Sequence, residues 1–205
     1  MEGVTVESVK RNRDSISLDF DDGSVVTAGL AYLPPEYADL CPGAVLGEEA
    51  AAILRHGENC LAAERAALRL ITRAEQCALG LTRKLEQRKH GPAAVKAVLD
   101  RLLGLGLVDD RRYAELWLKF PVSRGSRGPR ILRAALRAKG IDRETAEAAL
   151  EAALAGEAEL KLLGRCLKKA PRGKQPEQSG SEIRYFLKTE GFSTAAIEGY
   201  FDGTN

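Results

Sequence analysis

A period of 51 residues runs through the chain after residue 57 and constrains its fold more than any other feature. Apolar residues recur at this spacing in five columns, which are Leu81, Leu132 and Ile183; Leu85, Leu136 and Leu187; Val95, Ala146 and Ile197; Val98, Ala149 and Tyr200; and Leu99, Leu150 and Phe201. A fixed period with matched apolar positions is the signature of a repeat protein. Because one repeat cannot bury its apolar face alone, neighbouring repeats stack on one another. The period therefore predicts three tandem repeats, at residues 58–108, 109–155 and 156–205.

The first helix of the middle repeat is predicted from an acidic start and an apolar stripe. Asp109 and Asp110 stand where an N-cap and a first helical turn favour acidic residues. Pro121 predicts the end of this helix. Between them, one helix face carries apolar residues at i, i+3, i+4 and i+7, namely Tyr113, Leu116, Trp117 and Phe120. This face is predicted to be the packed side of the helix.

Glycine, proline and aspartate mark the next two helices of this repeat. Gly128-Pro129 predicts a helix start, because proline is tolerated at the first helical position. Gly140 fits the left-handed residue that closes a helix, and Asp142 fits the N-cap of the third helix. Each repeat is therefore predicted to contain three helices.

The first 57 residues predict an acidic extension and linker built around a small antiparallel sheet. Residues 4–10 and 15–20 alternate apolar and polar side chains, and Asp22-Gly23 before residues 25–30 is a hairpin signal. We expect the apolar side of the sheet to pack on the first repeat near Leu61 and Leu68. Helices are predicted at residues 48–54 and 60–74. The whole chain is thus predicted to be mainly α-helical, with an elongated curved array of repeats behind a small antiparallel sheet.

The formal net charge of +2 conceals a strong asymmetry along the chain. Residues 1–60 carry four basic and eleven acidic side chains, a balance of −7, and the remaining residues carry 27 basic and 18 acidic ones, a balance of +9. This split indicates a basic body that meets a polyanion or an acidic protein surface.

The candidate binding site consists of basic residues in and before the second helices of the first two repeats, and of lysines in the third repeat. Residues 119–139 contain no acidic side chain, and arginine forms bidentate hydrogen bonds with phosphates and carboxylates. Solvated basic helix faces are common, but the missing acidic partners favour an anionic ligand. The positions expected to contact it are Arg83, Lys84, Arg88, Arg124, Arg127, Arg130, Arg133, Arg137, Lys139, Lys168 and Lys169.

Catalysis finds little support in the sequence. His56 and His90 are the only histidines, and phosphate-loop, dinucleotide and zinc-protease motifs are absent. The four cysteines lack zinc-ligand spacing and are expected to be small buried residues, not disulfides. We therefore expect a non-enzymatic, cytoplasmic monomer without disulfides, cofactor, metal or membrane segment.

Five segments resemble the RecX family of RecA regulators. They are residues 68–73 (LRLITR), 81–85 (LTRKL), 98–102 (VLDRL), 106–114 (GLVDDRRYA) and 139–141 (KGI). The resemblance is good over residues 60–155 and looser in the third repeat, and it departs at Lys89, where a closing glycine is expected. It implies a regulator that binds along the groove of the RecA–DNA filament. Such proteins inhibit recombinase activity and the coupled ATP hydrolysis, and modulate DNA repair and the SOS response.

The alternative is a stand-alone helical protein that binds DNA by itself. Base readout uses Asn, Gln and Arg near the start of a recognition helix. The helices here carry mainly Arg, Lys and Ala. Such a protein would therefore contact the phosphate backbone of DNA and not its base edges.

Overall fold

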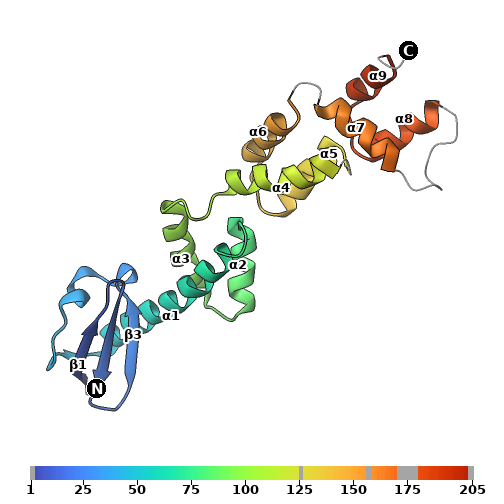
Figure 1. The fold of residues 1–205 in the computed structure, drawn as a ribbon. Helices are drawn as coiled ribbons and strands as arrows, with labels where there is room; N and C mark the ends of the chain where they lie inside the picture. The colour runs from blue at the N-terminus through green and yellow to red at the C-terminus, as the bar shows by residue number, and fades with distance from the viewer. Residues whose placement is uncertain (1–2, 125–126, 156–157, 170–179, 203–205) are drawn as a thin grey trace. The chain divides into compact units, whose positions relative to one another are not determined.

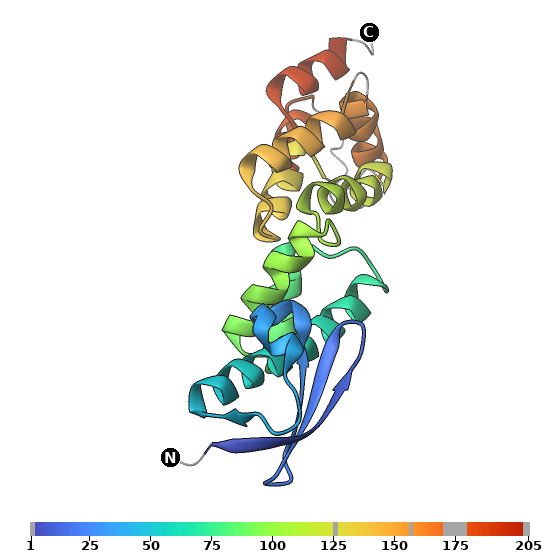
Figure 2. The same ribbon diagram turned by 90° about the vertical axis from the view of Figure 1, so that its left-hand side faces the viewer.

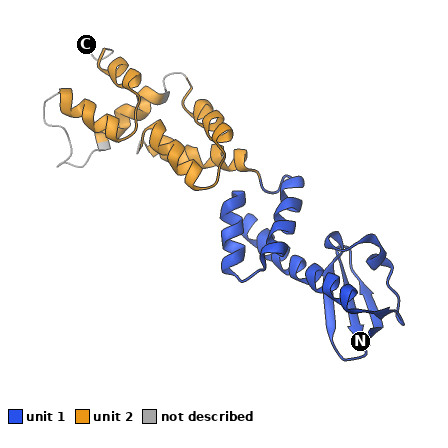
Figure 3. Ribbon diagram, turned by 180° about the vertical axis from the view of Figure 1, so that it is seen from behind, with its two compact units in different colours: residues 1–108 blue, residues 109–205 orange. Residues whose placement is uncertain are grey.

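The structure is a computed structural model that describes residues 3–124, 127–155, 158–169 and 180–202 (Figure 1). It is mainly helical, with a small antiparallel sheet at the N-terminus, as predicted. The elements are β1 (Val4–Arg11), β2 (Ser15–Phe20), β3 (Val25–Gly29), two 3-10 turns (Leu30–Tyr32 and Pro35–Asp39), β4 (Val45–Leu46), α1 (Glu48–Ile71), α2 (Ala78–Gln87), α3 (Pro92–Gly104), α4 (Asp110–Arg124), α5 (Pro129–Ala138), α6 (Arg143–Ala153), α7 (Ala158–Lys169), α8 (Gly180–Thr189) and α9 (Thr194–Asp202). The chain divides into two compact units, residues 1–108 and 109–205 (Figure 3).

The sheet has the strand order β3-β2-β1-β4, and all its pairs are antiparallel. The predicted hairpin joins β2 to β3, and Gly23 in its turn has a φ of +80°, which glycine adopts without steric cost. Alternation places Ile16, Leu18 and Phe20 on the buried face of β2. The sheet therefore has one apolar face that requires a cover.

Helix α1 supplies that cover and also serves the first repeat. Its N-terminal half lies beside β3, and its C-terminal half packs on α2 and α3 (Figure 2). The prediction of two helices here is wrong, because Gly57 does not break α1. A Cβ on Gly57 would lie 2.7 Å from Leu33 Cδ2 and 3.0 Å from Ala28 Cβ, so glycine allows the helix to approach the sheet closely. The predicted contact of the sheet is correct at Leu61, whose Cβ would lie 3.4 Å from a Cβ on Gly29 of β3, whereas Leu68 is 40% exposed.

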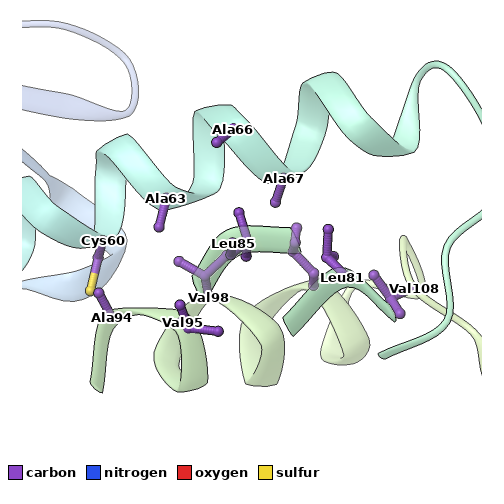
Figure 4. Packing of buried hydrophobic residues seen from close by; sticks show 11 residues of the cluster. Cys60, Ala63, Ala66, Ala67, Leu81, Leu85, Ala94, Val95, Val98 and Val108 are labelled. Atoms are coloured by element: carbon purple, nitrogen blue, oxygen red, sulfur yellow. The ribbon is translucent and has the colours of Figure 1, made fainter. Parts of the chain in front are cut away.

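The core of the first repeat lies between α1, α2 and α3 (Figure 4). Small residues of α1, among them Ala63 and Ala67, face Leu81 and Leu85 of α2 and the valines of α3. The second leucine column, Leu85, Leu136 and Leu187, is fully buried in all three repeats. The predicted apolar period thus marks the core of each three-helix unit.

The turn after the second helix of each unit has the same geometry. Lys89, Gly140 and Gly191 occupy it with φ values of 66°, 87° and 91°. The next residue donates its backbone N–H to the buried leucine carbonyl in every unit, in the pairs His90–Leu85, Ile141–Leu136 and Phe192–Leu187, at 3.2, 3.2 and 3.1 Å. This is the Schellman motif, in which a right-handed helix ends with one residue in the left-handed conformation. Lys89 adopts this conformation although its Cβ, which glycine lacks, makes it sterically unfavourable.

Replacing Lys89 with glycine is expected to raise the free energy of unfolding by about 1 kcal/mol. The left-handed conformation costs a residue with a Cβ roughly 1–2 kcal/mol, and the greater chain entropy of unfolded glycine offsets part of the gain. Gly140→Ala, the matched change in the next unit, is expected to destabilise by a similar amount. Urea denaturation measures both variants, and a Lys89→Gly variant no more stable than the parent would contradict the strain assigned to this turn.

Helix α4 differs from the prediction in its buried face and in its length. Asp109 does accept the N–H of Arg112 at 2.9 Å, as an N-cap should. The buried residues are Ala114 and Leu118, on the side of α4 that packs against α6 and α7, whereas Leu116 and Phe120 are 43% and 61% exposed. The prediction failed because Ala114, a small residue that permits close helix packing, contributes little to an apolar pattern.

The helix also continues through Pro121 to Arg124. Proline removes one hydrogen-bond donor and crowds the carbonyl four residues earlier. Only one helical turn follows Pro121, and Ser123 Oγ donates to the Phe120 carbonyl at 2.9 Å, which stabilises that turn. The prediction that Pro121 ends the helix is therefore wrong.

Candidate nucleic-acid interface

Helix α5 presents three of the predicted basic residues on the side away from its core. The helix begins at Gly128 with Pro129 at its first position, as predicted, and buries Leu132 and Leu136. Arg130, Arg133 and Arg137 lie within an arc of about 60° on the remaining surface, given 100° per residue. The structure therefore groups these arginines, but it gives them different surroundings.

The start of α5 is fastened to the turn between α8 and α9. Gly128 N donates to the Glu190 carbonyl at 2.8 Å, and Arg130 N donates to the Gly191 carbonyl at 3.0 Å. Arg127 Nη1 pairs with Glu190 Oε2 at 2.8 Å, and Arg130 Nη2 donates to the Lys188 carbonyl at 3.3 Å. Arg127 and Arg130 thus help to join the second and third three-helix units.

Arg133 also has an internal partner, while Arg137 is exposed. Arg133 Nε lies 2.5 Å from Glu147 Oε1 of α6, and both side chains are about 40% exposed. No ion pair involves Arg137 among the residues that the structure describes. Sequence reasoning missed Glu147 and Glu190 because they lie far from α5 along the chain. Partly exposed ion pairs contribute about 0–1 kcal/mol, so a phosphate can replace these carboxylates.

Cations lie over the aromatic rings of α4. Arg124 Cζ is 4.3 Å from the centroid of the Phe120 ring. Lys139, at the end of α5, places Nζ 5.4 Å from the Trp117 centroid and 6.0 Å from that of Tyr113. Two of the predicted basic residues therefore stand beside aromatic side chains and not on the α5 arginine face.

In the first three-helix repeat, two of the three predicted basic residues in and directly after α2 make local contacts. Lys84 Nζ donates to Gln76 Oε1 at 2.6 Å, and Gln76 is itself buried in the connection between α1 and α2. Arg88 Nη1 donates to the Lys84 carbonyl at 2.8 Å, and Arg83 is exposed. In the third unit Lys168 is exposed on α7, and the side chain of Lys169 lies outside the described residues.

The repeat relation does not align these basic residues into one row. Along the 51-residue period, Arg83 and Lys84 correspond to Ala134 and Ala135. Of the three basic residues, only Arg88 corresponds to a basic residue, which is Lys139 at the end of α5. The basic positions of the second helices therefore lie on different faces in different units.

A further basic row, which the sequence reasoning did not single out, lies on α1 and in the turn that follows it. Arg65, Arg69 and Arg73 are all exposed and follow one another at i, i+4 and i+8. That spacing places Arg65 and Arg69 on one side of α1, and Arg73 follows in the turn after the helix. Their regular spacing was the available signal, because all three lie within the helix predicted at residues 60–74.

A cysteine and a histidine lie close together on α1. Cys60 Sγ lies 3.4 Å from His56 Nε2 on α1. Burial, with the charge of Glu64 adding to it, raises the pKa of Cys60 to about 11, so the thiol stays protonated at neutral pH. This pair therefore lacks the thiolate of a nucleophilic site. Cys77 and Cys166 are buried as expected, whereas Cys41 is exposed, contrary to the prediction.

Two further groups of observations concern metals and membranes. Across the described ranges, no three His, Cys, Asp or Glu side chains are grouped so as to hold a metal ion. None of the helices that the structure describes has the length and apolar character needed to cross a membrane.

The fold and the surface define a class of protein: tandem three-helix units with basic residues on several helices. A family model described as "RecX, second three-helix domain" matches residues 109–150. Regulatory protein RecX of Thermobifida fusca (strain YX) is 34% identical over 128 residues, which are 62% of this chain and 69% of that protein. Regulatory protein RecX of Mycobacterium sp. (strain KMS) is 36% identical over 118 residues, which are 57% of this chain and 64% of that protein.

A crystal structure of regulatory protein RecX has the same fold, with a TM-score of 0.79 at 20% identity, over 97% of this chain and 99% of that one. Because the chain is 34% identical to the Thermobifida protein over 69% of that protein's length, it belongs to the RecX family of regulatory proteins.

Proposed function

We propose that this protein binds the RecA–DNA filament and inhibits recombinase activity and the coupled ATP hydrolysis, and so regulates recombination, DNA repair and the SOS response. Membership of the RecX family supports a regulatory role. The observation that carries the proposal is the set of exposed or exchangeable cations in residues 109–150, the segment that the family model matches. In this proposal the protein acts in the cytoplasm as a monomer, without a catalytic step of its own.

The proposed contact residues fall into two groups. Those exposed and without a described ion pair contact the filament directly, and they are Arg83, Arg137 and Lys168. The others exchange an internal contact for a phosphate or an acidic filament side chain, and they are Lys84, Arg88, Arg124, Arg127, Arg130, Arg133 and Lys139. Arg65 and Arg69 of α1, with Arg73 in the following turn, extend the basic surface of the first three-helix repeat. Lys169 remains a sequence-based candidate.

The direct test is the ATPase of RecA on single-stranded DNA, measured while the intact chain is added to assembled filaments. We expect a concentration-dependent fall in the rate of ATP hydrolysis and in strand exchange. An ATPase rate that stays constant up to a large excess of this protein over RecA would contradict the proposal.

Charge removal at exposed positions is expected to weaken binding without changing the fold. The variant carries Arg83→Gln, Arg88→Gln and Arg137→Gln, because these side chains are exposed and glutamine is a good helix former. Each phosphate contact contributes roughly 0.7 to the slope of log affinity against log salt on single strands, so the slope should fall by about 2. Arg111→Gln is the matched control, since exposed Arg111 pairs with Glu115 at 3.1 Å and lies outside the proposed set.

The measurement is a salt titration of DNA binding, with circular dichroism as the check on helix content. An unchanged slope in the triple variant would remove these three residues from the interface. A fall of about 0.7 in the Arg111→Gln control, the same per charge as in the triple variant, would assign the effect to net charge and not to the proposed positions.

The second candidate is a stand-alone DNA-binding protein. Exposed Arg65 and Arg69 on one side of α1, with exposed Arg73 in the turn after it, favour this candidate, because such cations can contact a phosphate backbone without any protein partner. The two candidates differ in whether RecA on the DNA strengthens binding.

A further inference from the structure

Three aromatic side chains share one face of α4 and reach the protein surface. Tyr113, Trp117 and Phe120 lie at i, i+4 and i+7, within an arc of about 60°. Phe120 is 61% exposed, and Tyr113 and Trp117 are half-buried. Aromatic residues make up only 5% of the chain, so three on one exposed face are a marked concentration.

Each ring of this aromatic face has a cation beside it. Arg124 continues the same face at the end of α4 and lies 4.3 Å from the Phe120 centroid. Lys139 reaches over from the end of α5, 5.4 Å from the Trp117 centroid and 6.0 Å from that of Tyr113. The face thus combines flat apolar rings with positive charges along one helix.

The fold itself does not require these aromatic residues. The positions 51 residues earlier hold Ala62, Ala66 and Arg69, and those 51 residues after Tyr113 and Trp117 hold Gly164 and Lys168. Helix α4 is anchored instead by Ala114 and Leu118, which are both 0% exposed. A three-helix unit therefore forms with small or charged residues at the aromatic positions, and the rings need another explanation.

We propose that the aromatic face of α4, formed by Tyr113, Trp117 and Phe120 with Arg124 and Lys139, binds single-stranded DNA by stacking unpaired bases on its rings. Stacking on aromatic side chains tolerates any sequence, because every base has a π face, and neighbouring cations hold the phosphates. A duplex hides the faces of its bases inside the helix, so the aromatic face discriminates against duplex DNA.

A nucleotide fits this face better than a protein segment does. A surface that binds an apolar peptide needs aromatic rings but no charges. A surface that binds an acidic peptide needs positive charges but no flat rings. The combination of a ring and a cation within about 6 Å matches the base and the phosphate of one nucleotide. The inference rests on the proposed function in one respect, which is that the polyanion bound by the protein is DNA.

The test uses the full chain and three fluorescently labelled probes of equal length: a single-stranded thymidine oligonucleotide, the same backbone without bases, and a duplex. Trp117 is the only tryptophan, so its emission reports the face directly. We expect the thymidine oligonucleotide to quench Trp117 and to bind more tightly than the abasic strand or the duplex.

The key variant is Phe120→Ala, which removes an exposed ring and leaves the buried residues of α4 in place. Loss of one stacked base is expected to weaken binding of the thymidine oligonucleotide about tenfold, within a range of about 5- to 150-fold, and to leave abasic binding unchanged. The control is Tyr185→Ala on α8. Its ring is 73% exposed, and no cation is described over it in the part of the chain that the structure covers.

Three results would overturn the inference. The first is equal affinity of the parent protein for the thymidine and abasic strands. The second is an equal loss on both strands in Phe120→Ala, which would mean backbone contact only. The third is weaker inhibition of RecA by Phe120→Ala with unchanged DNA binding, which would make the face a protein-docking surface. If the parent protein inhibits RecA but shows no base-dependent binding, the inference fails and the proposed function is still supported.

Discussion

Replacing Leu136 with alanine is expected to lower the free energy of unfolding of the second three-helix repeat by about 2–5 kcal/mol. Leu136 is 0% exposed, and it stands in the leucine column that is buried in every three-helix unit. The cost has two parts, the lost transfer of the side chain from water and the cavity that remains. Its carbonyl also accepts the Ile141 N–H at the helix end, so the backbone around the cavity is held in place and relaxes little.

Urea denaturation followed by far-ultraviolet circular dichroism measures this loss. Leu116→Ala is the matched control, because Leu116 is a leucine of the same unit that is 43% exposed. The control is expected to change the stability by less than about 1 kcal/mol. Similar losses in the two variants would contradict the assignment of the leucine column to the core.

Gly128→Ala is expected to lower the free energy of unfolding by about 1–3 kcal/mol, the usual cost of overpacking. A Cβ on Gly128 would lie 2.5 Å from Gly191 C and 2.6 Å from Phe192 N. Both are backbone atoms of a turn that is already left-handed at Gly191, so neither side moves away cheaply. The substitution should therefore break the hydrogen bonds by which α5 holds the turn between α8 and α9.

Gly91→Ala provides the control for Gly128→Ala. Both glycines are N-caps followed by a proline, but a Cβ on Gly91 would meet nothing within 4 Å. Gly91→Ala is expected to cost less than about 1 kcal/mol. Hydrogen exchange at Gly128 N and Arg130 N reports directly on the two hydrogen bonds between α5 and this turn. Unchanged protection of both amides in Gly128→Ala would contradict the prediction, because it would show that the turn adapts without losing these bonds.

The sequence predicted the three-helix units well because their signals are local and repeated. Leu85, Leu136 and Leu187 mark the buried face at a constant interval, and Gly140 marks a helix end that only a left-handed residue closes. The unusual Lys89 was recognisable for the same reason, since it occupies a position whose conformation the other units define.

The features that the sequence did not predict depend on contacts between distant residues. Helices were predicted at residues 48–54 and 60–74, yet Gly57 lies inside the single helix α1, where Ala28 and Leu33 leave no room for a larger residue. The acidic partners of Arg127 and Arg133 are Glu190, in the turn between α8 and α9, and Glu147 of α6. The basic site was therefore predicted as a set of residues, but not as a set with internal ion pairs.

The aromatic face of α4 was predicted as a packed side for a related reason. Its spacing at i, i+4 and i+7 is typical of a buried stripe. Burial instead follows Ala114 and Leu118, which lie on the side that α6 and α7 cover. Periodicity alone cannot tell which of two adjacent apolar faces a neighbouring helix covers.

The central claim is that the partner is the RecA–DNA filament and not DNA alone. Its most direct test compares the affinity of the intact chain for one fluorescently labelled single strand, bare or coated with RecA in the presence of a slowly hydrolysed ATP analogue, at the same salt concentration. The account predicts clearly tighter binding to the RecA-coated strand, with stoichiometric saturation along the filament. Equal or weaker binding to the coated strand would contradict it and identify a stand-alone DNA-binding protein.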